Sequence, residues 1–355
     1  TLSSFSVIVG GNSNVISGSN SEQSFIGGGC DNTISGNNSQ CSVISGGSTN
    51  TISGASSSYS FIGSGYQNVI SGTLSSFSLI SGGLSNTISG YNSYESFIGG
   101  GNQNAICGYN SQYSVIVGGY INTISGYNSF ESFIGGGFQN TISGTLSSFS
   151  VIVGGNSNVI SGSNSAQSFI GGGCDNIISG YNSQCSVISG GSDNIISGYN
   201  SQVSVISGGC QNTISGYYSN NSVISGGNAN TIEGYNSYNS IIVGGSLNKI
   251  NGYCSYESFI GGGIQNKISG VDSYSSNILG GSCNETQSPY TSIVGNYNYI
   301  PIGLTGASII GYGITASTPY TLHVNCLAVM ELPGSSASLQ LGMFYRDVDV
   351  VKVKI

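Results

Sequence analysis

Isoleucine recurs along this chain at fixed intervals set by an 18-residue repeat. Aligning the chain on Ser-x-Ile gives repeat starts at Ser6, at Ser24 and at every eighteenth residue as far as Ser276. The consensus is S-[VF]-I-x-G-G-x-x-N-[TV]-I-S-G-x-N-S-x-x, with Ile at positions three and eleven. Short β-branched segments separated by Gly, Asn and Ser are typical of strands and tight turns, so each repeat predicts two short strands.

A chain with this period predicts a solenoid, in which repeats stack and each contacts only its neighbours. We therefore expect an all-β fold, a parallel β-solenoid of about seventeen coils. Most coils span eighteen positions, whereas the two that start at Ser276 and Ser292 span sixteen, and Ser308 opens the last turn. The predicted domains are a shaft over residues 1–307 and a short β-rich C-terminal cap over residues 308–355. A flattened two-strand coil is our interpretation, and a three-sided coil is the alternative.

A second period lies above the first. Residues 1–32 and 145–176 differ only at Glu22 and Ala166, and the two segments start eight whole coils apart. A block of whole coils is therefore duplicated. A stack tolerates such an insertion because each coil contacts only its neighbours.

Three positions are expected to form the core of the stack. At a spacing of about 4.8 Å per coil, the Ile residues of positions three and eleven become two ladders that face each other. Position nine is always Asn, and an inward Asn can hydrogen-bond its amide to the coils above and below. The first members of these ladders are Ile8, Ile26 and Ile44 at position three, Ile16, Ile34 and Ile52 at position eleven, and Asn14, Asn32 and Asn50 at position nine.

Position two is expected to point outward, because it neighbours the inward Ile of position three. It is nevertheless apolar in almost every coil, and an apolar stripe on the order of 70 Å long should not be left in water. Either the coil is wider and this column belongs to the core, or the column packs against identical chains, most simply in a parallel homotrimer. The predicted assembly face consists of Val7, Phe25, Val43, Phe61, Leu79, Phe97, Val115, Phe133, Val151 and Phe169.

Two further columns have alternative interpretations. Position fourteen is Tyr in many coils, from Tyr91 to Tyr253, and these rings either pack on each other or form a sugar-binding platform. Positions ten and twelve often read Thr and Ser, as in Thr33 and Ser35, and such rows resemble those of solenoidal ice-binding proteins. Lys249 and other residues interrupt the rows.

The nine cysteines form no C-x-x-C pair. Cys174 and Cys210 share a position but lie two coils or about 10 Å apart, beyond disulfide reach. Disulfides between successive coils are therefore excluded. We expect free or buried thiols, with occasional interchain bridges as the alternative.

Composition argues against catalysis and against several partners. Only 5% of residues are charged, and all five Lys and Arg residues follow residue 248, so nucleic acid is not an expected partner. No run of 18 apolar residues occurs, so membrane insertion is not expected. The single His, His323, lacks the neighbours of a catalytic triad, and Asp31, Asp175 and Asp193 are too few for a calcium ladder. We expect no enzyme activity, no cofactor and no metal site.

The C-terminal region carries a resemblance. Thr318, Pro319, Tyr320, Leu322, His323, Val324 and Asn325 resemble the "T-x-P-x-Y-x-L-H-V-N-G" segment that closes many phage and virus tail-fibre proteins, although Cys326 replaces the Gly. Residues 332–355 resemble a second virion-protein ending through Leu332, Pro333, Ser335, Gly342, Tyr345, Asp347, Lys352 and Val353. The repeats are similar to the coils of phage-type fibres and, more loosely, to those of trimeric autotransporter adhesin heads.

The resemblance implies a trimeric, surface-exposed fibre whose C-terminal end is distal or caps the trimer. The first hypothesis is therefore a structural virion fibre for attachment or display, with a host-surface glycan or receptor as a further partner. A bacterial cell-surface adhesin or extracellular filament is the second, and an ice-binding solenoid the third. The expected location is the virion surface, the cell surface or the extracellular space. Because the chain begins at Thr1 without Met, we expect it to be part of a longer polypeptide.

Overall fold

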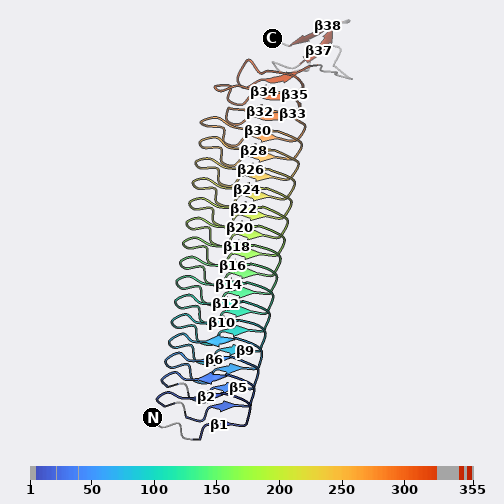
Figure 1. The fold of residues 1–355 in the computed structure, drawn as a ribbon. Coiled ribbons are helices and arrows are strands. Elements are labelled where there is room, and N and C mark those ends of the chain that lie inside the picture. The colour runs from blue at the N-terminus through green and yellow to red at the C-terminus, as the bar shows by residue number, and fades with distance from the viewer. Residues whose placement is uncertain (1–4, 21, 39, 326–343, 348–349, 354–355) are drawn as a thin grey trace.

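The protein contains a long rod of stacked coils, which begins near the N-terminus and extends to about residue 325 (Figure 1). Every regular element of the described residues is a β-strand, and none of these residues is helical. The predicted all-β parallel solenoid is therefore confirmed. The computed structural model describes residues 5–20, 22–38, 40–325, 344–347 and 350–353.

The first sheet runs along one side of the rod, and each coil contributes a strand of mostly two residues. Neighbouring strands pair in parallel with a shift of one coil, so that Phe25 pairs with both Val7 and Val43. The backbone N–H of Val43 donates to the carbonyl oxygen of Ser60 in the next coil at 2.9 Å, and this bond recurs along the stack. The 19 strands are β1 (Val7–Ile8), β3 (Phe25–Ile26), β5 (Val43–Ile44), β7 (Phe61–Ile62), β9 (Leu79–Ile80), β11 (Phe97–Ile98), β13 (Val115–Ile116), β15 (Phe133–Ile134), β17 (Val151–Ile152), β19 (Phe169–Ile170), β21 (Val187–Ile188), β23 (Val205–Ile206), β25 (Val223–Ile224), β27 (Ile241–Ile242), β29 (Phe259–Ile260), β31 (Asn277–Ile278), β33 (Ser292–Asn296), β35 (Ser308–Tyr312) and β36 (Leu322–Val324).

The second sheet is built in the same way from position ten and position eleven of each coil. Isolated parallel bridges at position seven, such as Tyr120 with Phe138, add a third contact between coils. Each coil therefore has two strands, as interpreted from the sequence, and a further bridged corner. The strands are β2 (Val15–Ile16), β4 (Thr33–Ile34), β6 (Thr51–Ile52), β8 (Val69–Ile70), β10 (Thr87–Ile88), β12 (Ala105–Ile106), β14 (Thr123–Ile124), β16 (Thr141–Ile142), β18 (Val159–Ile160), β20 (Ile177–Ile178), β22 (Ile195–Ile196), β24 (Thr213–Ile214), β26 (Thr231–Ile232), β28 (Lys249–Ile250), β30 (Lys267–Ile268), β32 (Glu285–Thr286) and β34 (Tyr299–Ile300).

The core is one continuous cluster made almost entirely of isoleucine from both sheets. Ile8 is 43% exposed and Ile16 is half-buried, in the first described coil of the stack. A fully buried Ile side chain contributes about 1.5–3 kcal/mol, so the stability of the rod grows with the number of stacked coils. The next members of the two ladders are completely buried: Ile26, Ile34, Ile44 and Ile52.

The asparagines of position nine form a second, polar ladder beside the isoleucines. In Asn140, Nδ2 donates to Oδ1 of Asn122 in the preceding coil at 3.1 Å and to the carbonyl oxygens of Gly136 and Gly155 at 2.9 Å. The backbone N–H of Asn140 also donates to Oδ1 of Asn122, at 3.0 Å. Asn32 and Asn50 make the same contacts at full burial, so these buried amides are fully paired.

Glycine and serine allow the coil to close. Gly137, at position six, has φ of 93°, and a Cβ there would lie 2.2 Å from the carbonyl oxygen of Gly155. Only glycine combines this backbone conformation with such a close approach of the next coil. The buried Ser60 donates from Oγ to the carbonyl oxygen of Ser75 at 2.9 Å, which joins the beginning of the coil to its last turn.

The register of the last coils differs from the one read from the sequence. The predicted coil starts at Ser276 and Ser292 would place Val294, sixteen residues after Ile278, in the core column. Instead, Ile278 pairs with Ile293, one position earlier than expected, and Ile293 is buried whereas Val294 is 37% exposed. The inward-facing residue of this coil is therefore Ile293. Thr291, two residues before it, is buried at the place that Ser occupies in the preceding coils. The next coil, from Ile293 to Ile309, has the expected length.

The first sheet continues past residue 307 through β35 and β36. His323 lies in β36 opposite Ile309, and its Nε2 accepts a hydrogen bond from the backbone N–H of Ser317 at 3.1 Å. Further along the chain, β37 (Phe344–Asp347) and β38 (Val350–Val353) form an antiparallel pair. The residues of the C-terminal resemblance that lie outside the described part of the chain are Cys326, Leu332, Pro333, Ser335 and Gly342.

Candidate functional site: the outer face of the first sheet

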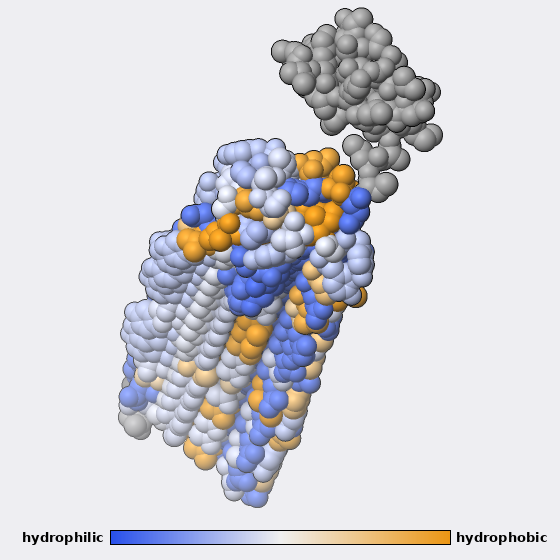
Figure 2. All heavy atoms as spheres, turned by 90° about the horizontal axis from the view of Figure 1, so that it is seen from above, coloured by the Kyte–Doolittle hydropathy of each residue, from blue (hydrophilic) through white to orange (hydrophobic). Residues whose placement is uncertain are grey.

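Side chains of one kind form stripes along the rod, because every coil repeats the same positions in register (Figure 2). The predicted assembly face is one of these stripes and lies on the outer side of the first sheet. Phe25 and Phe61 are 37% exposed and Phe169 36%, whereas the Ile next to each of them is completely buried. The column is therefore a surface feature, and the alternative that it belongs to the core is wrong. Val7 is also exposed, and the half-buried members are Val43, Leu79, Phe97, Val115, Phe133 and Val151.

Phenylalanine on this face is coupled to glycine two residues further along the strand. In the Phe133 coil, a Cβ at Gly135 would lie 3.3 Å from Cε1 of the Phe133 ring, so the ring lies over the glycine. Coils with an aliphatic residue at position two carry Ser or Val at position four, as Val115 and Val117 do. The six pairs are Phe25 with Gly27, Phe61 with Gly63, Phe97 with Gly99, Phe133 with Gly135, Phe169 with Gly171 and Phe259 with Gly261, with separations between 3.2 and 3.4 Å.

Sequence reasoning missed this coupling, although its signal was present. From Val7 to Phe169, aliphatic and aromatic residues alternate strictly at position two, and position four changes with them. The combined volume of the side chains at positions two and four therefore varies less from coil to coil than the volume at either position alone. From Val7 to Phe169 the consequence is a face of similar bulk in every coil, apolar except for Ser45 and Ser81, which suits a long and continuous contact.

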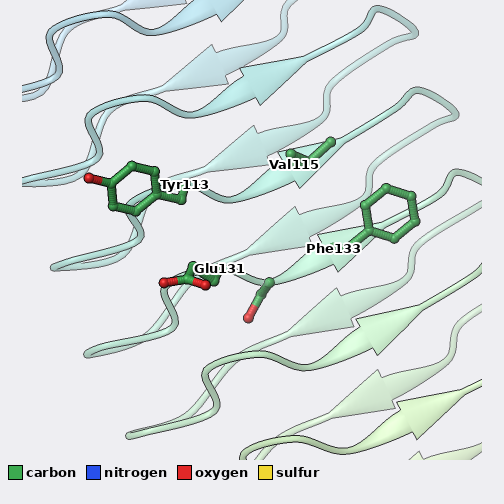
Figure 3. Close-up of a pocket in the computed structure, with 5 residues that line it drawn as sticks. Tyr113, Val115, Glu131 and Phe133 are labelled. Carbon is green, nitrogen blue, oxygen red and sulfur yellow. The ribbon is translucent and has the colours of Figure 1, made fainter.

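A hollow of about 530 Å³ borders the face between two neighbouring coils. Figure 3 shows Tyr113 and Glu131 on the turns that precede β13 and β15, with Val115 and Phe133 on the strands themselves. Glu131 has φ of 52°, and Tyr113 has φ of 54°, a conformation that directs both side chains outward from the turn. The hollow is lined by Tyr113, Val115, Glu131, Ser132 and Phe133.

The electrostatics of the hollow are those of a weakly acidic surface. A hydrogen bond with Tyr94, partial desolvation and the nearby charges of Glu95 and Glu131 raise the pKa of Tyr113 to about 12. The Tyr94 ring meets that of Tyr113 edge-on, with centroids 5.3 Å apart. Tyr113 is therefore a neutral phenol at physiological pH. No nucleophile, base and orienting group converge among the residues that line the hollow.

No protein-family model matches this chain, and no curated protein sequence matches it significantly.

The tyrosines of position fourteen pack on one another, as the first of their two interpretations expects. The Tyr199 and Tyr217 rings are stacked with centroids 4.6 Å apart and an interplanar angle of 4°. Because each ring face within a stack covers the next ring, those faces are closed to a sugar, and the edges and hydroxyl groups remain at the surface. Tyr217 is 38% exposed.

The outer face of the second sheet changes character towards the C-terminal end. Thr occupies position ten in many coils, and charged residues replace it from Lys249 onward. Lys249 forms an ion pair with Glu233, and Lys267 forms one with Glu285 at 3.0 Å. The Thr and Ser rows therefore do not extend along the whole rod.

The remaining candidate groups stay apart. The eight described cysteines are free, and Ser192 separates Cys174 from Cys210 in the stack. In the part of the chain that the structure describes, His, Cys, Asp and Glu side chains form no group of three that could hold a metal ion. The same residues contain no helix long and apolar enough to cross a membrane.

Proposed function

We propose that this chain is a structural fibre protein of a virion, a rigid rod for attachment or display that assembles as a parallel homotrimer through the outer face of its first sheet. The observation that carries the proposal is the apolar column that stays half-exposed from Val7 to Phe169. Monomeric proteins rarely leave a contiguous apolar patch of this length in water.

The size of the face agrees with a stable contact. Positions two and four lie about 7 Å apart along the chain, so with their side chains the face is about 10 Å wide. Followed over all its apolar coils, from Val7 to Phe259, it is about 70 Å long. A face of this size offers each chain roughly 700 Å² for contact with its two neighbours in a trimer, close to the ~800 Å² that each partner buries in a standard interface.

The chemistry of the face favours a second copy of the chain. No charged residue occupies position two or position four in any described coil from Val7 to Leu279. Copies that pack there in register therefore bury no unpaired charge, which would otherwise oppose assembly. The location on a virion rests on the C-terminal resemblance from Thr318 to Asn325.

Analytical ultracentrifugation with electron microscopy tests the proposal. The wild-type chain is expected to sediment as a trimer and to appear as rods, and Phe97→Asp with Phe133→Asp is expected to yield monomers that remain folded. The matched control is Thr123→Asp with Thr141→Asp, which places two carboxylates on the outer side of the second sheet and leaves the trimer intact. A wild-type monomer, or a trimer that survives the Phe substitutions, would contradict assembly through this face.

A further inference from the structure

Tyrosine rings from successive coils stack in long columns on the outside of the rod. In the longest column, Tyr217 and Tyr235 are parallel within 3°, with centroids 5.1 Å apart. Tyr235 and Tyr253 are parallel within 5° at 4.9 Å. Shorter stacks join Tyr91, Tyr109 and Tyr127 at position fourteen, and Tyr238, Tyr256 and Tyr274 at position seventeen.

The backbone holds these rings in register. Tyr217 and Tyr235 form a parallel bridge, and the backbone N–H of Tyr217 donates to the carbonyl oxygen of Gly234 at 3.2 Å. Because identical residues in identical conformations lie one coil apart, the same ring carbons face each other in both residues. Tyr217 is 38% exposed and Tyr235 39%, so small reagents reach the ring edges.

We propose that the stacked tyrosines are sites of oxidative cross-linking, in which neighbouring coils of one chain become joined by dityrosine bonds under a one-electron oxidant such as peroxidase-activated hydrogen peroxide. The proposal goes beyond the fibre function, because the bonds form between coils of one chain and do not depend on assembly with other chains. The dityrosine bonds link successive coils of the shaft covalently along its axis, which the free cysteines do not do.

The chemistry requires no group other than the two phenols and the oxidant. Each tyrosine loses one electron and its phenolic proton, and the two phenoxyl radicals join through a new bond between ortho carbons. Each ortho carbon then releases its hydrogen as a proton while the oxygen regains one, which restores both phenols. The two electrons and two protons lost by the pair reduce one hydrogen peroxide to two waters.

Geometry selects the stacked pairs. Radical coupling needs both ortho carbons within reach at the same moment, and about 4.8 Å between coils leaves only a small tilt of each ring to close the gap. Tyrosines two coils apart are about 10 Å from each other and cannot couple while the stack is intact. In its column Tyr120 stands between Asn102 and Phe138, so no phenol lies one coil away for it to react with.

Adjacent tyrosines in one coil provide a matched pair of variants. Tyr217 is stacked on Tyr235, whereas Tyr218 meets Tyr235 at 87° with centroids 6.1 Å apart. Cleavage after Glu233 and Glu257 of the denatured protein separates Tyr235 from both, so a bond across Glu233 appears as a linked pair of peptides that has lost two hydrogen atoms.

The full chain, with its thiols blocked, is oxidised by peroxidase and hydrogen peroxide and mapped by mass spectrometry. The linked pair is expected in the wild type and in Tyr218→Phe, and it is expected to fall at least tenfold in Tyr217→Phe and in denaturant. Absence of the link from the native wild type, or its survival in Tyr217→Phe, overturns the proposal. Mixed links from isotope-labelled and unlabelled chains would also overturn it, because they place the bond between chains. A monomeric wild type leaves this test unchanged.

Discussion

The Phe133 ring lies over Gly135, two residues ahead on the same outer face of the rod, with 3.3 Å between Cε1 and the place of a Cβ on the glycine. That Cβ would also lie 2.2 Å from the carbonyl oxygen of Val153 in the next coil. Both a side chain and a backbone atom therefore exclude a larger residue in this coil. The neighbouring coil reaches a similar bulk with Val115 and Val117 instead.

We therefore expect Gly135→Val to destabilise its coil by about 1–3 kcal/mol, the usual cost of overpacking. Adding Phe133→Val recreates the Val-Ile-Val sequence of the coils that contain Val115 and Val151. It removes the contact with the ring and is expected to restore part of the loss, whereas the close approach of the Val153 carbonyl oxygen remains. Native-state hydrogen exchange at the amides of β15 measures both effects. Simple additivity of the two substitutions would show that the ring and the glycine are not coupled.

The core could be predicted from the sequence because a fixed period assigns each residue a place in the stack. The positions of Ile134 and Asn140 carry Ile and Asn in coil after coil. Such small variation in bulk and chemistry is expected only of a column that faces inward. Coil width does not follow from the period, so the sequence left open whether Phe133 lies in the core or on the surface. Its half-exposed side chain places it on the surface.

The register predicted from the repeat alignment is wrong where the coil length changes. The Ser-x-Ile alignment selected Ser292 and Val294, but the pleat buries Ile293 and pairs it with Ile278. A one-residue shift moves every side chain to the other face of the strand, so burial and not the local motif decides the register. The ring over Gly135 was missed for a similar reason, since the sequence shows that two positions vary together but not that they touch.

The asparagine ladder predicts that Asn140→Leu destabilises the coils around it. Loss of Asn140 leaves the backbone N–H of Asn158 without its partner, at about 1–3 kcal/mol. It also removes one of the two hydrogen bonds that the buried Oδ1 of Asn122 accepts. Asn128→Leu is the control, because Asn128 accepts one bond from Asn110 on a half-exposed turn and its loss should cost under about 1 kcal/mol. Hydrogen exchange of the surrounding coils compares the two, and equal costs would mean that the buried ladder adds nothing.

Acid is expected to loosen the C-terminal coils through Glu285. Burial alone would raise the pKa of this carboxyl, but hydrogen bonds from Gln287, Ser269 and Lys267 outweigh it and lower the pKa below its ordinary value of 4.5. A carboxylate with a lowered folded-state pKa stabilises the fold fully above its unfolded pKa, and this contribution disappears as the pH falls through the folded pKa.

Hydrogen exchange of β30 and β32 between pH 6 and pH 3 checks this behaviour. Opening of these strands should increase below a pH of about 4.5 in the wild type, and the dependence should be weaker in Glu285→Gln. A profile shared by both proteins would assign the acid effect to another carboxyl. Glu131 offers a control of the opposite kind, since it is exposed on a turn and Glu131→Gln should leave the profile of β30 unchanged.

Stacking without long-range contacts predicts that damage to the core stays local. Ile134→Ala removes a completely buried side chain and is expected to cost about 2–5 kcal/mol, whereas Ile8→Ala, at a residue 43% exposed, should cost far less. Because each coil contacts only its neighbours, exchange protection should fall in the coils of Ile116, Ile134 and Ile152 and recover with distance along the rod. Uniform loss of protection from one end to the other would show instead that the shaft unfolds as a single cooperative unit. Ile134→Val, which removes one methylene, should reproduce the local pattern at about 0.5–1.5 kcal/mol and so separate cavity size from general disruption.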